Sequence, residues 1–308
     1  MTAPTTTILL PAFNEAESLP VVLNSIREYL SLIPGEVELL VVDDGSTDAT
    51  ADIAIRCGAR LIRHPHRKGA GAAVKTGILH ARGERVLLMD ADATYPAVSI
   101  PTLLLELEFS RQVIGTRTRE SGTIRWLRIP AKFLLRKLGE FLVRHPVPDL
   151  NSGMRAFGKR DALAFLHLLP DGHSCMSTLT LCFLGMGLPV RFVPIDYLPR
   201  IGKSKFHPVR DTFRFGVQIL RSVSYFAPLR IFLSASIVLF LAGCGKSAWD
   251  VARKGGLEES DIILFTFSLG AGMMGLLSDL IVKVANKPLF EMLHFPPPLP
   301  RAPEDRSK

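Results

Sequence analysis

Apolar positions in the first 115 residues follow two alternating spacings. Short, nearly continuous apolar runs predict buried strands, and apolar residues three and four positions apart predict amphipathic helices. The predicted strands are residues 6–10, 38–42, 59–62, 85–89 and 112–115. The predicted helices are residues 17–32, 47–56, 69–81 and 101–110. Because short strand–helix–strand units of this kind form parallel sheets covered on both faces, we predict an α/β fold with a mostly parallel sheet.

The last third of the chain contains two longer apolar runs. Residues 225–245 carry Arg230 as their only charge, and residues 262–282 carry only Asp279. Each run is close to the ~20 residues that a helix needs to cross a bilayer. A polar stretch, residues 246–261, separates them. We predict a transmembrane helical hairpin rather than two buried helices of a soluble domain, because long parts of both runs lack a polar face.

Composition and charge favour a protein at a membrane surface. The 308 residues have a net charge of +8, 47% hydrophobic residues and a mean hydropathy of +0.25. Basic residues gather before the first apolar run and after the second: Arg200, Lys203, Lys205, Arg210, Arg214, Arg221, Arg230, Lys283 and Lys287. By the positive-inside rule, both termini of this multi-pass membrane protein are then cytoplasmic. Because residues 1–7 do not resemble a signal peptide, we expect the N-terminal domain in the cytoplasm too.

The pattern divides the chain into four parts. We expect an α/β domain at residues 1–206, an amphipathic interfacial helix at 207–228, a transmembrane hairpin at 229–285 and a disordered cytoplasmic tail at 286–308. A further basic amphipathic helix is predicted at residues 124–143, and its basic side is either a solvated face or part of a helix that lies at the membrane or over the site. Nucleic acid is not an expected partner, because no stripe of aromatic and basic residues and no zinc-ligand spacing occurs. The four scattered cysteines indicate reduced thiols.

Acidic residues directly follow three of the predicted strands. Glu15 follows the first strand, Asp43 and Asp44 follow the second, and Asp90 and Asp92 follow the fourth. In a parallel sheet these turns meet at one edge, where open α/β sheets bind ligands. Carboxylates crowded there repel one another unless cations or hydroxyl donors are present. Such oxygen donors suit Mg²⁺ or Mn²⁺ holding a diphosphate, and the alternative is that they are solvated turn residues or helix caps.

These three motifs carry a family resemblance. Pro11-Ala12-Phe13-Asn14-Glu15, Asp43-Asp44-Gly45-Ser46-Thr47-Asp48 and Asp90-Ala91-Asp92 resemble the motifs of inverting family 2 glycosyltransferases with the GT-A (Rossmann-like) fold. More narrowly, the first two-thirds of the chain is similar to dolichyl- and polyprenyl-phosphate sugar synthases, and the paired apolar runs match a membrane-anchored branch. The resemblance implies a nucleotide pocket lined by Pro11, Phe13, Asn14, Glu15, Asp43, Asp44 and Ala91.

The same resemblance implies a metal site. Asp90 and Asp92 would form the DxD pair that binds Mg²⁺ or Mn²⁺, with Asp92 as the direct ligand. Thr94 stands where many relatives have Gln, so a third protein ligand is not implied. The segment from His64 to Gly71 departs from the family's Asn-x-Gly-Lys-Gly, and we interpret His64 and His66 as loop residues.

Basic motifs complete the resemblance. Gly115-Thr116-Arg117 resembles a Gly-Ser-Arg segment, whose guanidinium fork is well shaped to clamp phosphate oxygens. In Arg200-Ile201-Gly202-Lys203-Ser204-Lys205, Arg200 and Lys205 would close over the donor diphosphate, the alternative being a juxtamembrane basic patch. The residues implied in catalysis are Asp92, Arg117, Arg200 and Lys205.

The acceptor side is implied by weaker motifs. The residues implied at the acceptor phosphate are Arg117, Arg128, Lys132, Asp149, Ser152 and Arg155. Lys132 lies near the place where the family has Ser. Asp149 would orient the acceptor or Arg155, and its alternative is a turn or a structural ion pair.

Together these features predict a metal-dependent inverting transfer of a sugar. The donor would be a GDP- or UDP-sugar, and the acceptor a polyprenyl phosphate (dolichyl or undecaprenyl phosphate) at the cytoplasmic membrane face. Two alternatives stay open: transfer to another membrane lipid or glycan by the same fold, and a non-catalytic membrane protein that binds nucleotide sugars. The sequence is also compatible with a homo-oligomer.

Overall fold

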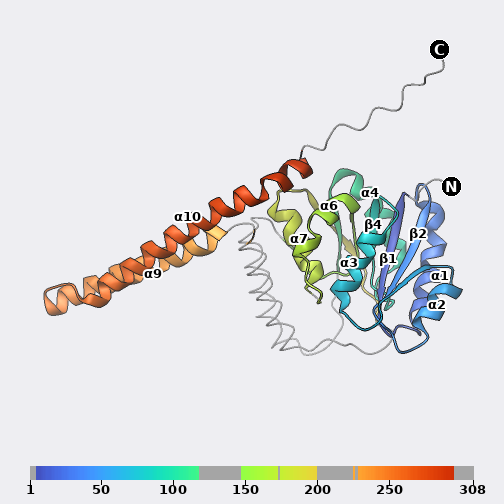
Figure 1. Ribbon diagram of the computed structural model, residues 1–308, viewed down its shortest axis with the longest axis horizontal. Coiled ribbons are helices and arrows are strands. Elements are labelled where there is room, and N and C mark those ends of the chain that lie inside the picture. Colours follow the sequence, from blue (N-terminus) through green and yellow to red (C-terminus); the bar gives the residue numbers. More distant parts are fainter. Residues whose placement is uncertain (1–4, 118–146, 173, 200–224, 226–227, 295–308) are drawn as a thin grey trace, which may run out of the picture. The chain divides into compact units, whose positions relative to one another are not determined.

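A computed structural model describes residues 5–117, 147–172, 174–199, 225 and 228–294. The chain divides into two compact units, Met1–Phe226 and Ala227–Lys308 (Figure 1). The predicted amphipathic helices at 124–143 and 207–228 lie wholly or almost wholly outside the described residues.

The first unit is built around one seven-stranded sheet. Its strands are β1 (Thr6–Ala12), β2 (Val37–Asp43), β3 (Arg60–Arg63), β4 (Arg85–Leu88), β5 (Gln112–Arg117), β6 (Arg155–Gly158) and β7 (Val190–Ile195). The strand order is β3-β2-β1-β4-β6-β5-β7. β6 runs antiparallel to β4 and β5, and every other pair is parallel. The predicted mostly parallel α/β sheet is confirmed, with β6 and β7 added to the five predicted strands.

Helices cover both faces of this sheet (Figure 1). The α-helices are α1 (Leu19–Tyr29), α2 (Thr50–Arg56), α3 (Ala70–His80), α4 (Ile100–Glu106), α6 (Lys159–Ala164) and α7 (Cys175–Gly185). Short 3₁₀ turns are η1 (Leu30–Leu32), η2 (Ala97–Ser99), η3 (Leu107–Phe109) and η4 (Leu166–Leu168). Alternate residues of β1 face opposite sides. Ile8 and Leu10 join the core that includes buried residues of α1 and α4, whereas Leu9 packs against Gly77 of α3.

One edge of the sheet collects the candidate residues. All strands except β6 end at this edge, and β6 begins there. Arg155, the first residue of β6, pairs with Leu88 of β4 and with Ile114 of β5. The loops after β1, β2, β4 and β5 and the loop before β6 therefore meet at the C-terminal edge, where open α/β sheets bind ligands.

The opposite edge is held by a buried carboxylate, Glu38 of β2. Its Oε2 accepts hydrogen bonds from Thr7 Oγ1 (2.7 Å) and from the Arg82 backbone N–H (2.8 Å), and its Oε1 accepts one from Arg60 Nη1 (2.7 Å). Burial by itself raises the pKa of Glu38, but the hydrogen bonds from Arg82, Thr7 and Arg60 outweigh it, so the pKa lies below its ordinary value. The ionised carboxylate thus stabilises the folded state.

Replacing Glu38 by Gln should destabilise the protein by about 1.5–3 kcal/mol at neutral pH, because hydrogen bonds to a charged acceptor are lost. The folded-state pKa is depressed, so this contribution is complete above the ordinary carboxyl pKa of about 4.3 and is lost as pH falls through the folded-state value. Thermal unfolding in detergent at several pH values measures it, with the exposed Glu36→Gln as control. Equal unfolding midpoints for the two variants at pH 7 would contradict the prediction.

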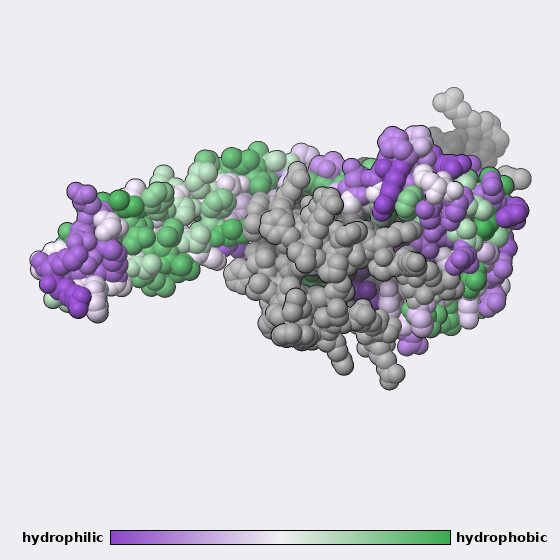
Figure 2. All heavy atoms as spheres, turned by 90° about the horizontal axis from the view of Figure 1, so that it is seen from below, coloured by the Kyte–Doolittle hydropathy of each residue, from purple (hydrophilic) through white to green (hydrophobic). Residues whose placement is uncertain are grey.

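The second unit is a helical hairpin of α9 (Pro228–Lys254) and α10 (Glu259–His294). Both helices are long and apolar enough to cross a membrane, with mean hydropathies of 1.8 and 1.6 in their most apolar windows. Only 11% and 17% of those windows are buried, so most of the apolar surface faces outward, unlike that of a core helix. Figure 2 shows hydrophobic residues along the hairpin and hydrophilic residues at its connecting end. The predicted pair of apolar helices is confirmed.

Small and hydroxyl side chains hold the two helices together. Ser236 Oγ donates to the Ser268 carbonyl (2.7 Å), and Ser268 Oγ donates back to the Ser236 carbonyl (2.9 Å). A Cβ at Gly275 would lie 2.8 Å from Phe232 Cβ, so glycine permits the close approach there. This is the packing expected of helices in lipid. α10 continues to His294, past residue 286, where the sequence predicted that a disordered tail begins.

Candidate active site

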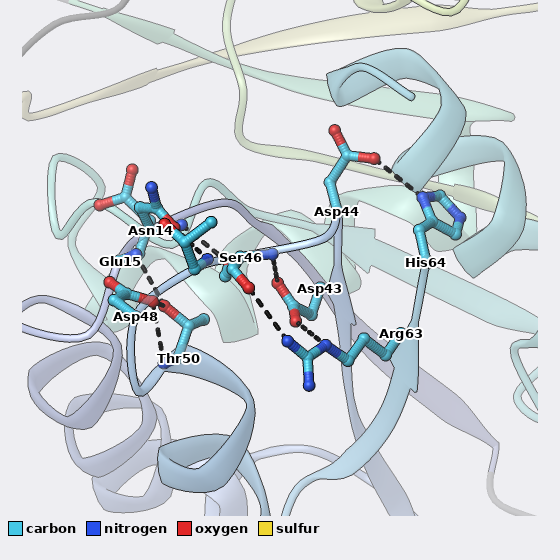
Figure 3. Close-up of polar contacts among 10 residues, drawn as sticks. Asn14, Glu15, Asp43, Asp44, Ser46, Asp48, Thr50, Arg63 and His64 are labelled. Carbon is cyan, nitrogen blue, oxygen red and sulfur yellow. Dashed lines mark hydrogen bonds and ion pairs between the residues drawn. The ribbon is translucent and has the colours of Figure 1, made fainter. Parts of the chain in front are cut away.

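The loops after β1 and β2 form one hydrogen-bonded unit (Figure 3). The Asn14 N–H donates to Ser46 Oγ (2.9 Å), and the Thr47 N–H donates to Asn14 Oδ1 (2.9 Å). Glu15 is joined to the same unit through its N–H, which donates to Thr50 Oγ1 (2.9 Å). Asn14 has a φ of 51°, a left-handed conformation that Asn adopts more readily than most residues. The predicted nucleotide residues of both loops are thus brought together.

Asp43 and Asp44 lie at the predicted edge, and their carboxylates contact protein donors. Asp43, fully buried, accepts from the Ser46 N–H (2.9 Å) and lies 3.1 Å from Arg63 Nε. Asp44 accepts from the backbone N–H groups of Lys68 (2.9 Å) and Gly69 (2.8 Å). Both carboxylates therefore organise the loops around the predicted pocket, whatever they contact when a ligand is bound.

His64 is a structural residue that the sequence analysis missed. It follows β3 directly, its Nδ1 lies 2.8 Å from Asp44 Oδ1, and its Nε2 lies 2.9 Å from Thr76 Oγ1 in α3. The prediction that His64 and His66 are loop residues is confirmed, but the His64 side chain is buried, whereas His66 is exposed. One signal could have predicted this contact. β2 and β3 follow one another in the sequence as predicted strands, and when such strands pair in parallel, the residues just after each strand become neighbours.

Replacing His64 by Phe should lower stability by about 1–3 kcal/mol, because Asp44 and Thr76 each lose a partner while the volume of the ring is kept. The exposed His66→Phe should change stability by less than about 0.5 kcal/mol. Thermal unfolding of the two variants side by side measures the difference. Indistinguishable unfolding midpoints would show that the His64 contacts contribute nothing.

An aromatic–cation stack adds a second unpredicted residue at this edge. Arg67 places its guanidinium carbon 4.4 Å from the ring centre of Phe13, which directly follows β1. The contact covers one of the aromatic residues predicted to line the nucleotide pocket.

The two aspartates after β4 have different surroundings. Asp92 is 7% exposed, and its Oδ1 accepts from Thr94 Oγ1 (2.6 Å) and the Thr94 N–H (3.1 Å). Thr94 therefore supports Asp92 through its hydroxyl group. Ala93 between them has a φ of 62°, a strained conformation for a residue with a Cβ. Ser18 Oγ donates to the Ala91 carbonyl (2.7 Å), which fastens this loop to the start of α1.

Asp90 lies against the loop that enters β6. A Cβ at Gly153 would lie 2.5 Å from Asp90 Cγ and 2.7 Å from its Oδ1, and closer still to Oδ2. The Gly153 N–H donates to Tyr95 Oη (2.7 Å). Burial and the nearby Asp90 charge raise the pKa of Tyr95. Gly153 is therefore the residue that lets this loop and the Asp90 carboxylate pack together.

The donor set at this edge fits a hard divalent cation bound together with a diphosphate. Among the described residues, no group of three or more His, Cys, Asp or Glu side chains is arranged to hold a metal ion. Mg²⁺ usually takes one or two carboxylates and completes its shell with substrate phosphates and water. Asp90 and Asp92 would supply such carboxylate oxygens to a cation that is bound together with a diphosphate.

Arg117, the last residue of β5, is held by Asp149. Its Nε donates to Asp149 Oδ2 (2.7 Å) and its Nη2 to Asp149 Oδ1 (2.9 Å), a bidentate pair. The hydrogen bonds and charge of Asp149 outweigh burial and raise the pKa of Arg117; in turn, the Arg117 contacts outweigh burial and lower the pKa of Asp149. Among the described residues, Asp149 makes an ion pair, one of the alternatives that the sequence left open, and its partner is Arg117 and not Arg155.

Arg155 lies inside the protein rather than at the acceptor side. It is fully buried, and its guanidinium donates to the carbonyls of Ser152 and Met176 and to Thr180 Oγ1. Burial lowers its pKa to about 10. Ser152 is fully buried as well. Every described hydrogen bond of the Arg155 guanidinium ends on protein oxygen, which indicates a structural role, and the acceptor contacts of Arg155 and Ser152 stay predictions.

Four predicted site residues lie outside the described residues: Arg128, Lys132, Arg200 and Lys205. The structure brings the others to one edge, with Pro11 inside β1 and Ala91 buried between the two aspartates.

Comparison with known proteins assigns both units. The sequence profile of "Glycosyl transferase family 2" matches residues 7–164, and that of "GtrB C-terminal hairpin" matches residues 227–284. An uncharacterized glycosyltransferase of Mycobacterium tuberculosis (strain ATCC 25618 / H37Rv) is 32% identical over 200 residues, which cover 65% of this chain and 88% of that protein.

Two further relatives have more specific descriptions. A dolichyl-phosphate beta-glucosyltransferase of Trichomonas vaginalis (strain ATCC PRA-98 / G3) is 28% identical over 245 residues, covering 72% of this chain and 71% of that protein. Glucosyl-3-phosphoglycerate synthase of M. tuberculosis, solved with Mn²⁺, UDP-glucose and phosphoglyceric acid, has a TM-score of 0.55 and 25% identity, covering 71% of this chain and 78% of that one. That enzyme binds Mn²⁺ and a UDP-sugar on a similar fold.

Proposed function

Since the chain belongs to glycosyltransferase family 2 and is therefore a glycosyltransferase, we propose that it transfers a sugar from a nucleotide diphosphate sugar to a polyprenyl phosphate. The observation that carries the proposal is the meeting of Asp90, Asp92 and Arg117 at one sheet edge, in a chain that ends in an apolar hairpin. Carboxylates there suit a cation with a diphosphate, and an arginine suits a phosphate. The relative named for dolichyl phosphate supports the same acceptor class.

Asp90 and Asp92 would hold Mg²⁺ or Mn²⁺ in this proposal, and the cation would neutralise charge on the leaving nucleoside diphosphate. Thr94 keeps the Asp92 carboxylate oriented through its hydroxyl (2.6 Å). The loops after β1 and β2 would bind the nucleoside, with Pro11, Phe13, Asn14, Glu15, Asp43 and Asp44 around it and Ala91 beneath. Whether the base is guanine or uracil depends on contacts within these loops.

Arg117 would bind the acceptor phosphate. A phosphate monoester is already anionic near neutral pH, so it needs little help from a general base when it attacks the sugar. Attack opposite the leaving diphosphate inverts the anomeric carbon. Arg117, together with Arg200, Lys205, Arg128 and Lys132 from outside the described residues, would balance the charge of donor and acceptor.

The hairpin would anchor this chemistry beside its lipid substrate. Holding the site near the headgroup layer raises the effective concentration of lipid phosphate. The basic residues on both sides of the hairpin support a topology in which the catalytic domain and both termini would lie on the cytoplasmic face. In this proposal residues 1–206 form the catalytic domain and residues 207–228 an interfacial helix leading into the hairpin.

A donor panel tests the proposal. Purified full-length protein in detergent, with MnCl₂ or MgCl₂, is incubated with radiolabelled GDP-mannose, UDP-glucose or other UDP-sugars and with undecaprenyl phosphate or dolichyl phosphate. We expect one donor to label the lipid phosphate, and no label with the corresponding polyprenol, which lacks the phosphate. Label that appears in another lipid or glycan, identified by mass spectrometry, would replace the proposed acceptor. Nucleotide-sugar binding without transfer to any acceptor would overturn the proposal.

A further inference from the structure

The loop of residues 149–153 fastens two parts of the site at once. At one end, Asp149 makes the bidentate pair with Arg117; at the other, Gly153 lies against Asp90. Only three residues of chain lie between the two contacts, and the Asn151 N–H donates to Asp149 Oδ1 (3.0 Å), which stiffens the turn between them. This short loop therefore links the position of the candidate phosphate-binding arginine to that of a candidate metal ligand.

Two of the three guanidinium nitrogens of Arg117 already have hydrogen-bond partners in the protein. Its Nε and Nη2 are bonded to Asp149, and its guanidinium carbon lies 5.4 Å from the ring centre of Tyr197. Tyr197 packs edge-on against Tyr95, 5.3 Å between ring centres, and Tyr95 accepts the Gly153 N–H. The Nη1 group has no hydrogen-bond partner among the described residues, and 17% of the side chain is exposed. One edge of the guanidinium is thus held by protein, and the other is left for an anion.

We propose that Asp149 is a positioning residue that fixes which edge of Arg117 meets the acceptor phosphate. The inference rests on the proposed function, because it assigns the anion to the acceptor. Two effects act in opposite directions when Asp149 loses its charge. A phosphate is repelled by the Asp149 carboxylate, so removing that charge does not weaken phosphate binding. The released guanidinium gains rotational freedom, so the bound phosphate is no longer held in line for attack.

The two effects predict a split between binding and turnover. Asp149→Asn should lower kcat at least about tenfold, because a shift of the bound phosphate by up to about 1 Å greatly slows a transfer reaction. Its affinity for farnesyl phosphate, a short soluble acceptor probe, should match that of the wild type within about twofold or exceed it. A residue that only stabilised the fold would lower the unfolding midpoint and weaken substrate binding together.

The chain offers a matched control at the other end of the same strand. Arg111 directly precedes β5, and its Nη1 lies 3.3 Å from Asp161 Oδ2. Asp161→Asn therefore breaks another partly buried Asp–Arg pair, between α6 and the residue before β5, away from the edge that carries the site. We expect kcat of this variant to stay within about twofold of the wild type, because Arg111 lies at the opposite end of β5 from Arg117.

A double-mutant cycle identifies the route of the effect. If Asp149 acts through Arg117, Asp149→Asn should have no further effect on kcat when Arg117 is already Lys, whose single amine lacks the fork. Activity is measured with the donor found by the panel, and farnesyl phosphate binding by isothermal titration calorimetry of the full-length protein. Asp149→Glu, which keeps the charge, should recover part of the lost turnover.

The outcomes separate this inference from the proposed function. Transfer by the wild type with an unchanged kcat in Asp149→Asn, an equal loss in Asp161→Asn, weakened farnesyl phosphate binding, or a full effect in the Arg117→Lys background overturns the positioning role alone. No transfer with any donor overturns the proposed function and this inference with it.

Discussion

Replacing Asp92 by Asn is expected to reduce sugar transfer by at least about a hundredfold, a loss of about 2.7 kcal/mol of transition-state stabilisation. Asn has nearly the same shape as Asp, and its amide oxygen can still accept the Thr94 hydroxyl hydrogen bond, which is 2.6 Å long in the native protein. The negative charge that would bind Mg²⁺ or Mn²⁺ is lost, and charge neutralisation by a bound metal is worth several kcal/mol in such reactions. The loss should therefore fall on catalysis and not on folding.

Radiolabelled transfer to polyprenyl phosphate over a range of MnCl₂ concentrations measures this effect. The half-maximal metal concentration should rise in the Asp92 variant, while the midpoint of thermal unfolding stays close to that of the wild type. Asp52→Asn, an exposed carboxylate at the start of α2, is the control and should keep full activity. Full activity of the Asp92 variant would rule out the metal role assigned to this residue.

Gly153→Ala is expected to reduce transfer at least about tenfold, although only one methyl group is added. That methyl group would lie 2.5 Å from Asp90 Cγ and 2.7 Å from its Oδ1, distances that Cβ atoms do not tolerate. Either the Asp90 carboxylate rotates away or the loop moves and breaks the hydrogen bond from the Gly153 N–H to Tyr95 Oη (2.7 Å). Both responses displace groups that the proposed reaction needs in place, and small displacements at reacting groups cost large factors in rate.

Gly172→Ala is the matched control, because a Cβ at Gly172 meets nothing within 4 Å among the described atoms. We expect it to retain activity and stability close to the wild type. Measuring transfer and unfolding midpoints for both variants separates the steric effect from the general cost of removing a glycine. If Gly153→Ala kept more than half of the wild-type activity, the close packing of Gly153 on Asp90 would have no part in function.

Local sequence patterns were sufficient to predict most of the strands and helices of the first unit. The spacing of apolar residues predicts the first five strands and the helices between them, because nearly continuous apolar runs and apolar residues three and four positions apart can both be recognised within one short segment. α1 illustrates this: its buried residues Leu19, Val22, Leu23 and Ile26 are three and four positions apart. The hairpin could be predicted for a similar reason, because the length and apolarity of a single run decide whether that run can span a bilayer.

Two strands escaped prediction because their surroundings come from distant parts of the chain. β6 is four residues long and becomes a strand between β4 and β5, about 40 to 70 residues earlier in sequence by its register pairs Ile114↔Arg155 and Leu88↔Arg155. β7 also pairs with a distant strand, because its parallel partner is β5, with Val190 opposite Gln112. Neither pairing leaves a local signal as strong as that of the earlier strands.

The chain's sequence by itself determined the fold class, the apolar hairpin and, through its motifs, the family. Those properties depend on residues close together along the chain or on types of residue at set spacings. Only the tertiary structure decided which charged groups are available to a ligand. Arg155 became a buried structural residue, His64 a partner of Asp44, and Asp149 the partner of Arg117, 32 positions away. Such assignments depend on which strands and loops become neighbours, because a charge entering the interior must find its partner wherever the folded chain places one.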